Sequence, residues 1–200
     1  MGLDYGSFIL ALDADSVRAI RADVELWSAV EDYPPFGPQL GDETFPAFSY
    51  RLLDEVPIGD GWIEHFGDRS FRQAEYLLDP VTYLETTSWE QRERTTAYQM
   101  IFGQEPFAHE GMQPGRCNWR CSRSAWLATT AQRIDTLGVA AARRNFSVAQ
   151  MLDQGVYKVH PEDVGHDDER FAQILANLRE FAEHCRRVAD QGLDLVIKLV

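Results

Sequence analysis

The residues best suited to bind an anion lie in one basic stretch near the middle of the chain. Residues 111–147 carry six arginines and a single acid, in a chain whose formal net charge is −13. Arginine beside tryptophan can hold a phosphate or stack on a planar ligand. The candidate ligand- or partner-binding residues are Arg116, Trp119, Arg120, Arg123 and Trp126. The alternative is that these arginines form ion pairs with the acidic N-terminal half of the chain.

A second stretch has the residue types of a metal site. Residues 160–169 read HPEDVGHDDE, so two imidazoles lie six residues apart among carboxylates. Imidazole and carboxylate groups together suit divalent transition metals, which makes His160, Asp163 and His166 the candidate ligands. The proline and glycine in this stretch also indicate a turn, and acids are typical of the first turn of a helix. We favour the turn and expect no metal and no other cofactor.

The three cysteines do not form a zinc or disulfide pattern. Cys117 and Cys121 form one C-x₃-C pair without a second pair, whereas structural zinc sites use four ligands. Cys185 falls on the apolar side of a predicted helix, where a buried thiol is expected. Arginines near Cys117 and Cys121 could lower a thiol pKa, so a reactive thiol is an alternative. The odd, low cysteine count favours a reducing compartment, and we expect the protein in the cytoplasm.

Sequence motifs for common catalytic and nucleotide-binding sites are absent. The sequence contains no G-x-x-x-x-G-K-[ST], no G-x-G-x-x-G, no G-x-S-x-G and no H-E-x-x-H. The strong negative charge disfavours nucleic acid and anionic membrane surfaces as partners. No apolar run is long enough to span a bilayer. These observations favour a protein that is not an enzyme, without deciding the question.

The elements that must position the candidate residues form an α/β (α+β) pattern. Apolar runs at 5–12 and 193–200 each predict a buried strand, and placing both in one sheet joins the two ends of the chain. We therefore expect a single domain over residues 1–200, with a small mixed sheet packed against about six helices. Periodicity and capping signals predict helices at 13–30, 46–55, 70–78, 88–103, 122–137 and 167–189, with a further short helix at 147–155.

Local signals set the expected ends of these elements. A Ser-x-x-Gln spacing typical of a capping box begins three of the helices, at Ser70, Ser88 and Ser147. Asp79-Pro80 and Gly138 are expected to end two helices. Pro57–Gly61 predicts a break in the chain, and the glycines and prolines of 104–118 predict a loop.

The two ends of the chain resemble the YfbM-like family of bacterial proteins. The C-terminal part reads VYKVHPED, then acids, then FAQILANLREFAEHCRRVADQGLDLVIKLV, and the start reads MGLDYGSFILALDADSVRAI. These pieces are similar to the family's Tyr/His-Pro turn, its long helix with a glycine stop and closing strand, and its opening strand with an acid-capped helix. Residues 35–140 lack the family's Leu/Trp-rich segment. The resemblance implies an α/β fold with the terminal strands side by side, and it implies no activity.

Composition and motifs together favour a non-enzymatic binding or regulatory protein, of which an immunity-like protein is one form, acting on a protein partner. An acidic surface suits a basic partner. Aromatic residues in expected loops could contribute contacts: Tyr33, Phe36, Trp62 and Phe107. The alternative is a small hydrolase or transferase that acts on an anionic small molecule through an Arg/Trp-lined pocket. The sequence leaves the oligomeric state open.

Overall fold

A computed structural model describes residues 7–27, 58–64, 66, 68–111 and 119–199 of the chain. Some sequence predictions fall outside these residues. They concern the helix at 46–55, the residues Arg116 and Cys117, and the aromatic residues Tyr33 and Phe36.

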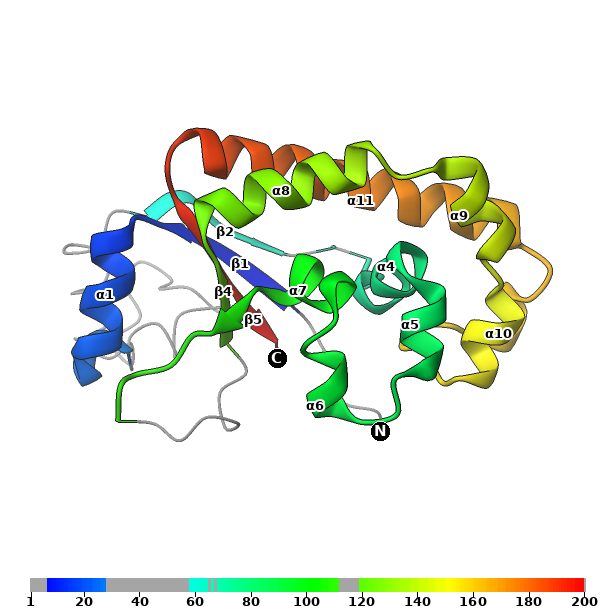
Figure 1. The fold of residues 1–200 in the computed structure, drawn as a ribbon, viewed down its shortest axis with the longest axis horizontal. Coiled ribbons are helices and arrows are strands. Elements are labelled where there is room, and N and C mark those ends of the chain that lie inside the picture. Colours follow the sequence, from blue (N-terminus) through cyan, green and yellow to red (C-terminus); the bar gives the residue numbers. More distant parts are fainter. Residues whose placement is uncertain (1–6, 28–57, 65, 67, 112–118, 200) are drawn as a thin grey trace, which may run out of the picture.

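One five-stranded sheet holds the two terminal strands side by side (Figure 1). Its order is β2-β1-β5-β4-β3, and β1 pairs with β5 from Ser7 opposite Leu199 to Leu12 opposite Asp194. The strands are β1 (Ser7–Leu12), β2 (Ile58–Glu64), β3 (Glu105–Pro106), β4 (Trp119–Ser122) and β5 (Asp194–Leu199). Both predicted terminal strands and the α/β fold class are confirmed.

Every described strand pair is antiparallel, so the sheet is not mixed as expected. The helices between them explain why β4 and β5 run in opposite directions. After β4 the chain leaves along one long helix and returns along another, so it re-enters the sheet at the end it left and runs the opposite way.

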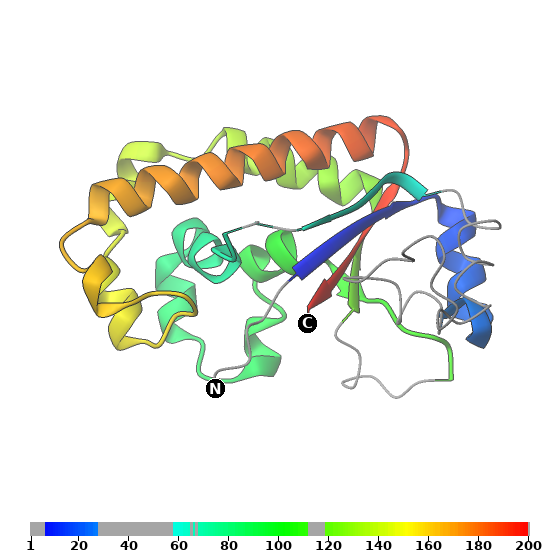
Figure 2. The ribbon, with the colours of Figure 1, turned by 180° about the vertical axis from the view of Figure 1, so that it is seen from behind.

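The described residues contain more helices than the six or so expected, because the helix predicted at 88–103 is divided into two and because helices at 80–85 and 139–145 were not predicted. The α-helices are α1 (Ala14–Ala22), α4 (Phe71–Leu78), α5 (Pro80–Glu85), α6 (Trp89–Arg92), α7 (Thr96–Phe102), α8 (Ser124–Asp135), α9 (Val139–Asn145), α10 (Val148–Asp153) and α11 (Asp167–Asp190). Figures 1 and 2 show α8 and α11 side by side, extending from the sheet over α4 and α7 toward α9 and α10. Helix α1 lies at the opposite end of the molecule.

The main core lies beneath the α8–α11 pair. As predicted, α11 buries an apolar stripe at helical spacing, which includes Phe171, Ile174, Leu178, Phe181 and Cys185. Each large apolar side chain buried in this way contributes roughly 1.5–3 kcal/mol. The core continues from the sheet to α4, α7 and α10. The placement of residues 1–200 in a single domain stays a prediction.

Two elements near the start of the chain differ from the sequence prediction. Helix α1 begins as expected, because the Asp13 side chain accepts a hydrogen bond from the backbone N–H of Ser16, but it ends at Ala22 rather than near residue 30. Asp23 interrupts it, and residues 24–27 form a further helical turn, whose first N–H groups the Asp23 carboxylate caps. The predicted break at Pro57–Gly61 overlaps strand β2, whose pairing with β1 the local sequence does not reveal.

The predicted capping box of α4 is wrong, although the helix is correct. Ser70 precedes the helix without a side-chain capping bond, and Gln73 is fully buried. The Gln73 amide donates to the carbonyl oxygen of Lys158 at 2.8 Å and accepts from Arg170 at 3.0 Å. Ser70 accepts from Asn177 of α11. Tertiary hydrogen bonds have therefore replaced the local ones.

Short-range caps divide the next stretch into three helices. Pro80 begins α5 as well as following α4, because the Asp79 carboxylate caps the new helix through the N–H of Thr82 at 3.0 Å. Ser88 caps α6 as predicted. Helix α6 ends after one turn, because Thr95 caps α7.

The region around β4 was expected to be a loop followed by a helix from residue 122. Residues 119–122 are instead a fully buried strand between β5 and β3, and α8 begins at Ser124. The prediction that Gly138 caps the end of this helix is wrong, because Thr136 is the C-cap of α8 and Gly138 instead occupies the N-cap position of α9. The predicted cap at Ser147 is confirmed by its bond from the N–H of Gln150.

Candidate functional site

The described arginines of the basic stretch do not gather in one pocket. Strand β4 sends Arg120 toward α7, on the same side of the sheet as its opposite residue Ile197. Arg123 follows the end of β4 and reaches β3 and β5 instead. Because successive strand residues point to opposite faces, Trp119 and Cys121 lie on the side that faces away from α7. The two arginines therefore belong to two separate networks.

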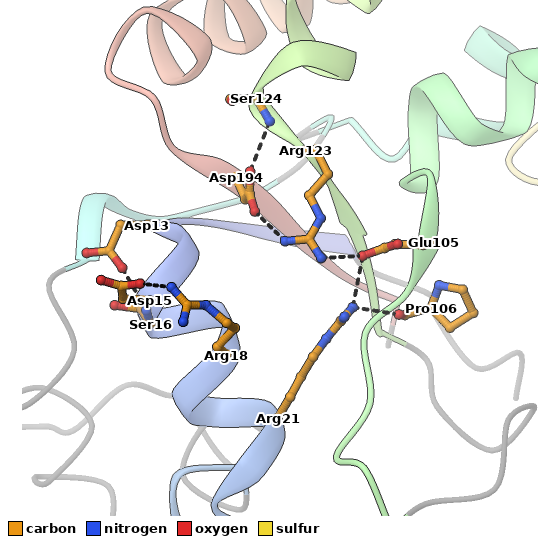
Figure 3. A network of polar contacts seen from close by, with 10 residues as sticks. All are labelled: Asp13, Asp15, Ser16, Arg18, Arg21, Glu105, Pro106, Arg123, Ser124 and Asp194. Atoms are coloured by element: carbon orange, nitrogen blue, oxygen red, sulfur yellow. Dashed lines mark hydrogen bonds and ion pairs between the residues drawn. The ribbon is translucent and has the colours of Figure 1, made fainter.

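The first network, which we call the sheet-end network, joins Arg21, Glu105, Arg123, Ser124 and Asp194 (Figure 3). Arg123 donates to the carboxylates of Asp194 and Glu105, both at 2.8 Å. Arg21 reaches from α1 to the same Glu105 oxygen at 3.1 Å. Two carboxylates and two guanidinium groups thus connect α1, β3, β5 and the end of β4.

Asp194 has a second role in this network. Its other oxygen accepts from the N–H of Ser124 at 2.9 Å, so a buried carboxylate of β5 caps the first turn of α8. The hydrogen bond from Arg123 to Asp194 raises the pKa of the Arg123 guanidinium, which stays charged. The donors of Arg123 that a bound anion would need are engaged by these acids.

The two tryptophans of the candidate set have different surroundings. Trp119 is buried against Trp27 and Phe107, with ring centroids 6.3 and 6.4 Å away. Phe107 is also fully buried, so it is not an exposed loop aromatic. Trp126 is half-buried on α8, and its Nε1 donates to the carbonyl oxygen of Gln99 at 3.4 Å. These contacts place both rings in the packing of the fold, and ligand binding by them stays a prediction.

The second network, which we call the α6 network, was not found from the sequence. It consists of Arg72, Glu75, Arg92, Glu93 and Arg120. Glu75 is the centre: its side chain is 2% exposed and pairs with Arg72 at 2.9 Å and Arg92 at 3.8 Å. Arg120 pairs with Glu93 at 3.6 Å. These five residues come from α4, from β4, and from α6 and its C-cap.

Aromatic rings hold the arginines of the α6 network in place. The Arg72 guanidinium lies 4.3 Å from the ring centroid of Phe102, 4.7 Å from that of Trp89 and 5.6 Å from that of Tyr98. Arg120 lies 5.2 Å from the same Tyr98 ring. Arginine favours such stacked positions, because its delocalised charge is weakly hydrated.

Burial has the largest effect on the pKa values of Glu75 and Tyr98 in this network. Desolvation raises the pKa of Glu75, despite the opposing effect of Arg72 and Arg92. Burial also raises the pKa of Tyr98 to about 12. A buried acid with a perturbed pKa, beside several arginines, is a combination often found at functional sites. A sequence signal existed, because Glu75 lies on the otherwise apolar face of the helix predicted at 70–78.

Gly103 allows Arg120 to reach this position. Its φ of +108° lies in a region that favours glycine, and a Cβ placed there would lie 2.8 Å from the Arg120 Cβ. Arg120 then donates from Nε to the carbonyl oxygen of Gly103 at 2.9 Å. A turn without a side chain thus brings the end of α7 against β4.

The candidate metal ligands form a turn. The N–H of His160 donates to the Asp163 carboxylate at 2.9 Å, and His166 lies 3.5 Å from Glu169 on the first turn of α11. Among the residues the structure describes, no group of three or more His, Cys, Asp or Glu side chains could hold a metal ion. The expectation that no metal is bound stays a prediction.

The described cysteines are buried thiols. Burial raises the pKa of Cys121 to about 12, outweighing the opposing effect of Arg123, and burial also raises the pKa of Cys185. The reactive-thiol alternative is therefore wrong for Cys121. Cys185 occupies the core position predicted for it.

An apolar groove lies where α4 and α5 meet the junction of α8 and α9. It encloses about 260 Å³ and is lined by Leu77, Leu78, Asp79, Pro80, Val81, Leu137, Gly138, Ala141, Ala142 and Asn145. Of these residues, Val81 on the α5 side is 58% exposed, and Ala141 on the α9 side is also exposed. The groove is therefore lined mainly by apolar side chains, some of which are open to solvent.

The comparisons with known proteins show the fold alone. No family model and no curated protein matches the sequence. The fold is similar to the crystal structure of YfbM from Escherichia coli, a protein of unknown function, with a TM-score of 0.59 and 14% sequence identity over 98% of this chain and 99% of that one. None of the described helices is long and apolar enough to cross a membrane. The chain is thus YfbM-like in its fold.

Proposed function

We propose that this protein binds a protein partner through the apolar groove between α5 and α9 and acts without catalysis, as a binding or regulatory protein. The supporting observation is a hollow lined mainly by apolar side chains, of which Val81 on one side and Ala141 on the other are exposed. Exposed apolar surface of this kind is typical of sites that bind another protein.

The size and chemistry of the groove favour a protein partner over a small-molecule substrate. Its volume of about 260 Å³ is below the ~300–1,000 Å³ that ligand pockets usually enclose. Asp79 is the one titratable residue of its lining, and that carboxylate already caps α5. The groove suits one or two apolar side chains of a partner, which is how anchor residues bind at protein interfaces.

The alternative of an enzyme with an Arg/Trp-lined pocket has less support. Arg123 donates to two carboxylates, and Arg120 donates to two backbone carbonyl groups. The net charge of −13 favours a basic partner surface around the apolar anchor. An immunity-like role and a cytoplasmic location are part of the proposal.

A matched set of aspartate variants tests the proposal. The immobilised full-length protein and its V81D and A141D variants, both changed at residues that line the groove, are compared in capturing proteins from a lysate of the native cell at low salt. V164D is the control, because Val164 is 44% exposed but lies in the turn before α11. We expect one stoichiometric protein to be held by the wild type and V164D and lost from both groove variants. Equal capture by all four proteins, or capture of no stoichiometric protein, would contradict the proposal.

A further inference from the structure

We propose that α6 covers a binding site for a phosphate group, formed by Arg72 and Arg120 beside Tyr98. This site is separate from the apolar groove and does not rest on the proposed function. The two guanidinium groups lie 5.6 and 5.2 Å from the same Tyr98 ring, so they converge on one place in the fold. Both side chains are largely buried, which strengthens their interaction with an anion.

The bonds of Arg120 leave one guanidinium nitrogen weakly used. Its Nε donates to the carbonyl oxygen of Gly103 at 2.9 Å and its Nη2 to that of Gln104 at 3.4 Å. These bonds fix the plane of the group. Its Nη1 has the Glu93 carboxylate at 3.6 Å, an ion pair beyond normal hydrogen-bond length. Glu93 thus lies where an anion would bind but holds Arg120 only loosely through Oε2, while its Oε1 accepts from the Trp89 Nε1 of the same helix at 2.6 Å.

Helix α6 has the properties of a cover. It is a single turn with no buried residue, between connecting segments on both sides. Trp89 is 51% exposed and contacts Arg72 and Tyr98, and Glu93 is 35% exposed. Arg92 pairs with Glu75 at 3.8 Å. Arg92 also lies 4.0 Å from the Tyr83 ring centroid, and Gln99 donates to the Glu93 carbonyl oxygen at 3.3 Å. All of these contacts are made by a single helical turn at the surface, so α6 can open locally without disturbing the core.

The charge under α6 favours a dianion. Arg72, Arg92 and Arg120 face the carboxylates of Glu75 and Glu93. Moving α6 away takes both Arg92 and Glu93 with it and leaves Arg72 and Arg120 beside one acid, Glu75, whose burial already disfavours its charged form. Arginine donors arranged in planar forks match the oxygens of phosphate. The ligand is therefore a phosphate group, either the free ion or a phosphate monoester.

The test measures phosphate binding by calorimetry and by the fluorescence of the full-length protein, whose exposed Trp89 lies at the site. The wild type is compared with E93Q, which removes the carboxylate that competes for Arg120. We expect E93Q to bind inorganic phosphate about tenfold more tightly than the wild type, because the competing internal anion is gone. The matched control is E105Q, since Glu105 also pairs with two arginines but belongs to the sheet-end network. We expect no gain from E105Q.

A second probe distinguishes the two sources of the phosphate group. Glycerol phosphate is titrated beside inorganic phosphate, and tighter binding of the ester assigns the site to a phosphorylated small molecule. R120M is expected to lose binding, with its folding checked by circular dichroism. Absence of phosphate binding by both the wild type and E93Q at millimolar concentrations would overturn the proposal. An equal gain from E105Q would overturn it as well, because the effect would then follow from net charge alone.

Discussion

Two arginine networks lie at the two ends of strand β4, and they neutralise charge in different ways. In the sheet-end network, Arg123 makes two hydrogen bonds of 2.8 Å to the carboxylates of Asp194 and Glu105. In the α6 network, Arg120 lies on an aromatic ring and has its nearest carboxylate 3.6 Å away. In the sheet-end network the carboxylates engage the donors of Arg123. In the α6 network one donor of Arg120 stays within reach of another acceptor.

The difference separates a structural role from a binding role. Asp194 and Arg123 connect β5, β3 and the first turn of α8, so these residues stabilise the fold. Glu93 comes from the last turn of a short surface helix and adds little to the core. Arginine content alone, which directed attention to residues 111–147, does not distinguish these cases. The partners of each guanidinium group do.

The largest expected effect comes from breaking the sheet-end network. D194A removes the cap of α8 and leaves Arg123 without its buried partner, and we expect a loss of about 2–3 kcal/mol in the free energy of unfolding. The control, E93A, should cost at most about 1 kcal/mol, since partly exposed ion pairs contribute little. Urea unfolding measures both. Equal losses of unfolding free energy from D194A and E93A would show that the two networks contribute equally to the stability of the fold.

A smaller effect is expected from G103A, which disturbs the contact that places Arg120. The new Cβ would lie 2.8 Å from the Arg120 Cβ at a φ of +108°, and we expect a loss of about 2 kcal/mol. G155A is the control, because Gly155 has a φ of +64° with no atom within 4 Å of an added Cβ. Its loss should be about 1 kcal/mol, from the backbone conformation alone. A G155A loss as large as that of G103A would argue against the close contact.

The pH dependence of stability sharpens the comparison further. The folded state raises the pKa of Glu75 above its ordinary 4.5, so it binds more protons than the unfolded state between the two values. The wild type should therefore lose stability relative to E75Q as the pH rises through that window, and the difference should be constant above it. Urea unfolding of both proteins from pH 4 to 8 measures this. A relative gain for the wild type would mean that the arginines outweigh burial.

Asp13 provides a control of opposite sign. The hydrogen bond from the backbone of Ser16 lowers the pKa of this half-buried capping carboxylate below 3.8. The wild type should therefore lose stability relative to D13N as the pH falls below 3.8 toward the folded pKa, and keep a constant difference at higher pH. A difference independent of pH would indicate that the cap does not depend on the charge.

The sequence was sufficient where the signal was local or continuous. Apolar runs identified β1 and β5, and the apolar stripe of residues 171–185 identified α11. Strand β4 has four residues that include an arginine, so its sequence does not resemble a buried strand. It becomes one because β5 and β3 lie on either side of it.

The candidate site was harder to predict, because its contacts join distant residues. Asp194 is 71 positions from Arg123, and Glu93 is separated from Arg120 by most of α7, β3 and the start of β4. Periodicity and capping rules describe neighbours within a few positions. They could place Glu75 on a buried helical face, but not the arginines that surround it.

Native-state hydrogen exchange of the backbone amides tests the central claim most directly, namely that α6 opens while β4 stays fixed. The N–H of Arg92, bonded to the carbonyl oxygen of Ser88, reports on α6, and the N–H of Ile197, in the strand beside β4, reports on the sheet. We expect Arg92 to exchange through a local opening that costs far less free energy than global unfolding, while Ile197 exchanges only with global unfolding. Equal protection of Arg92 and Ile197 would contradict the account, because α6 could then not uncover the arginines beneath it.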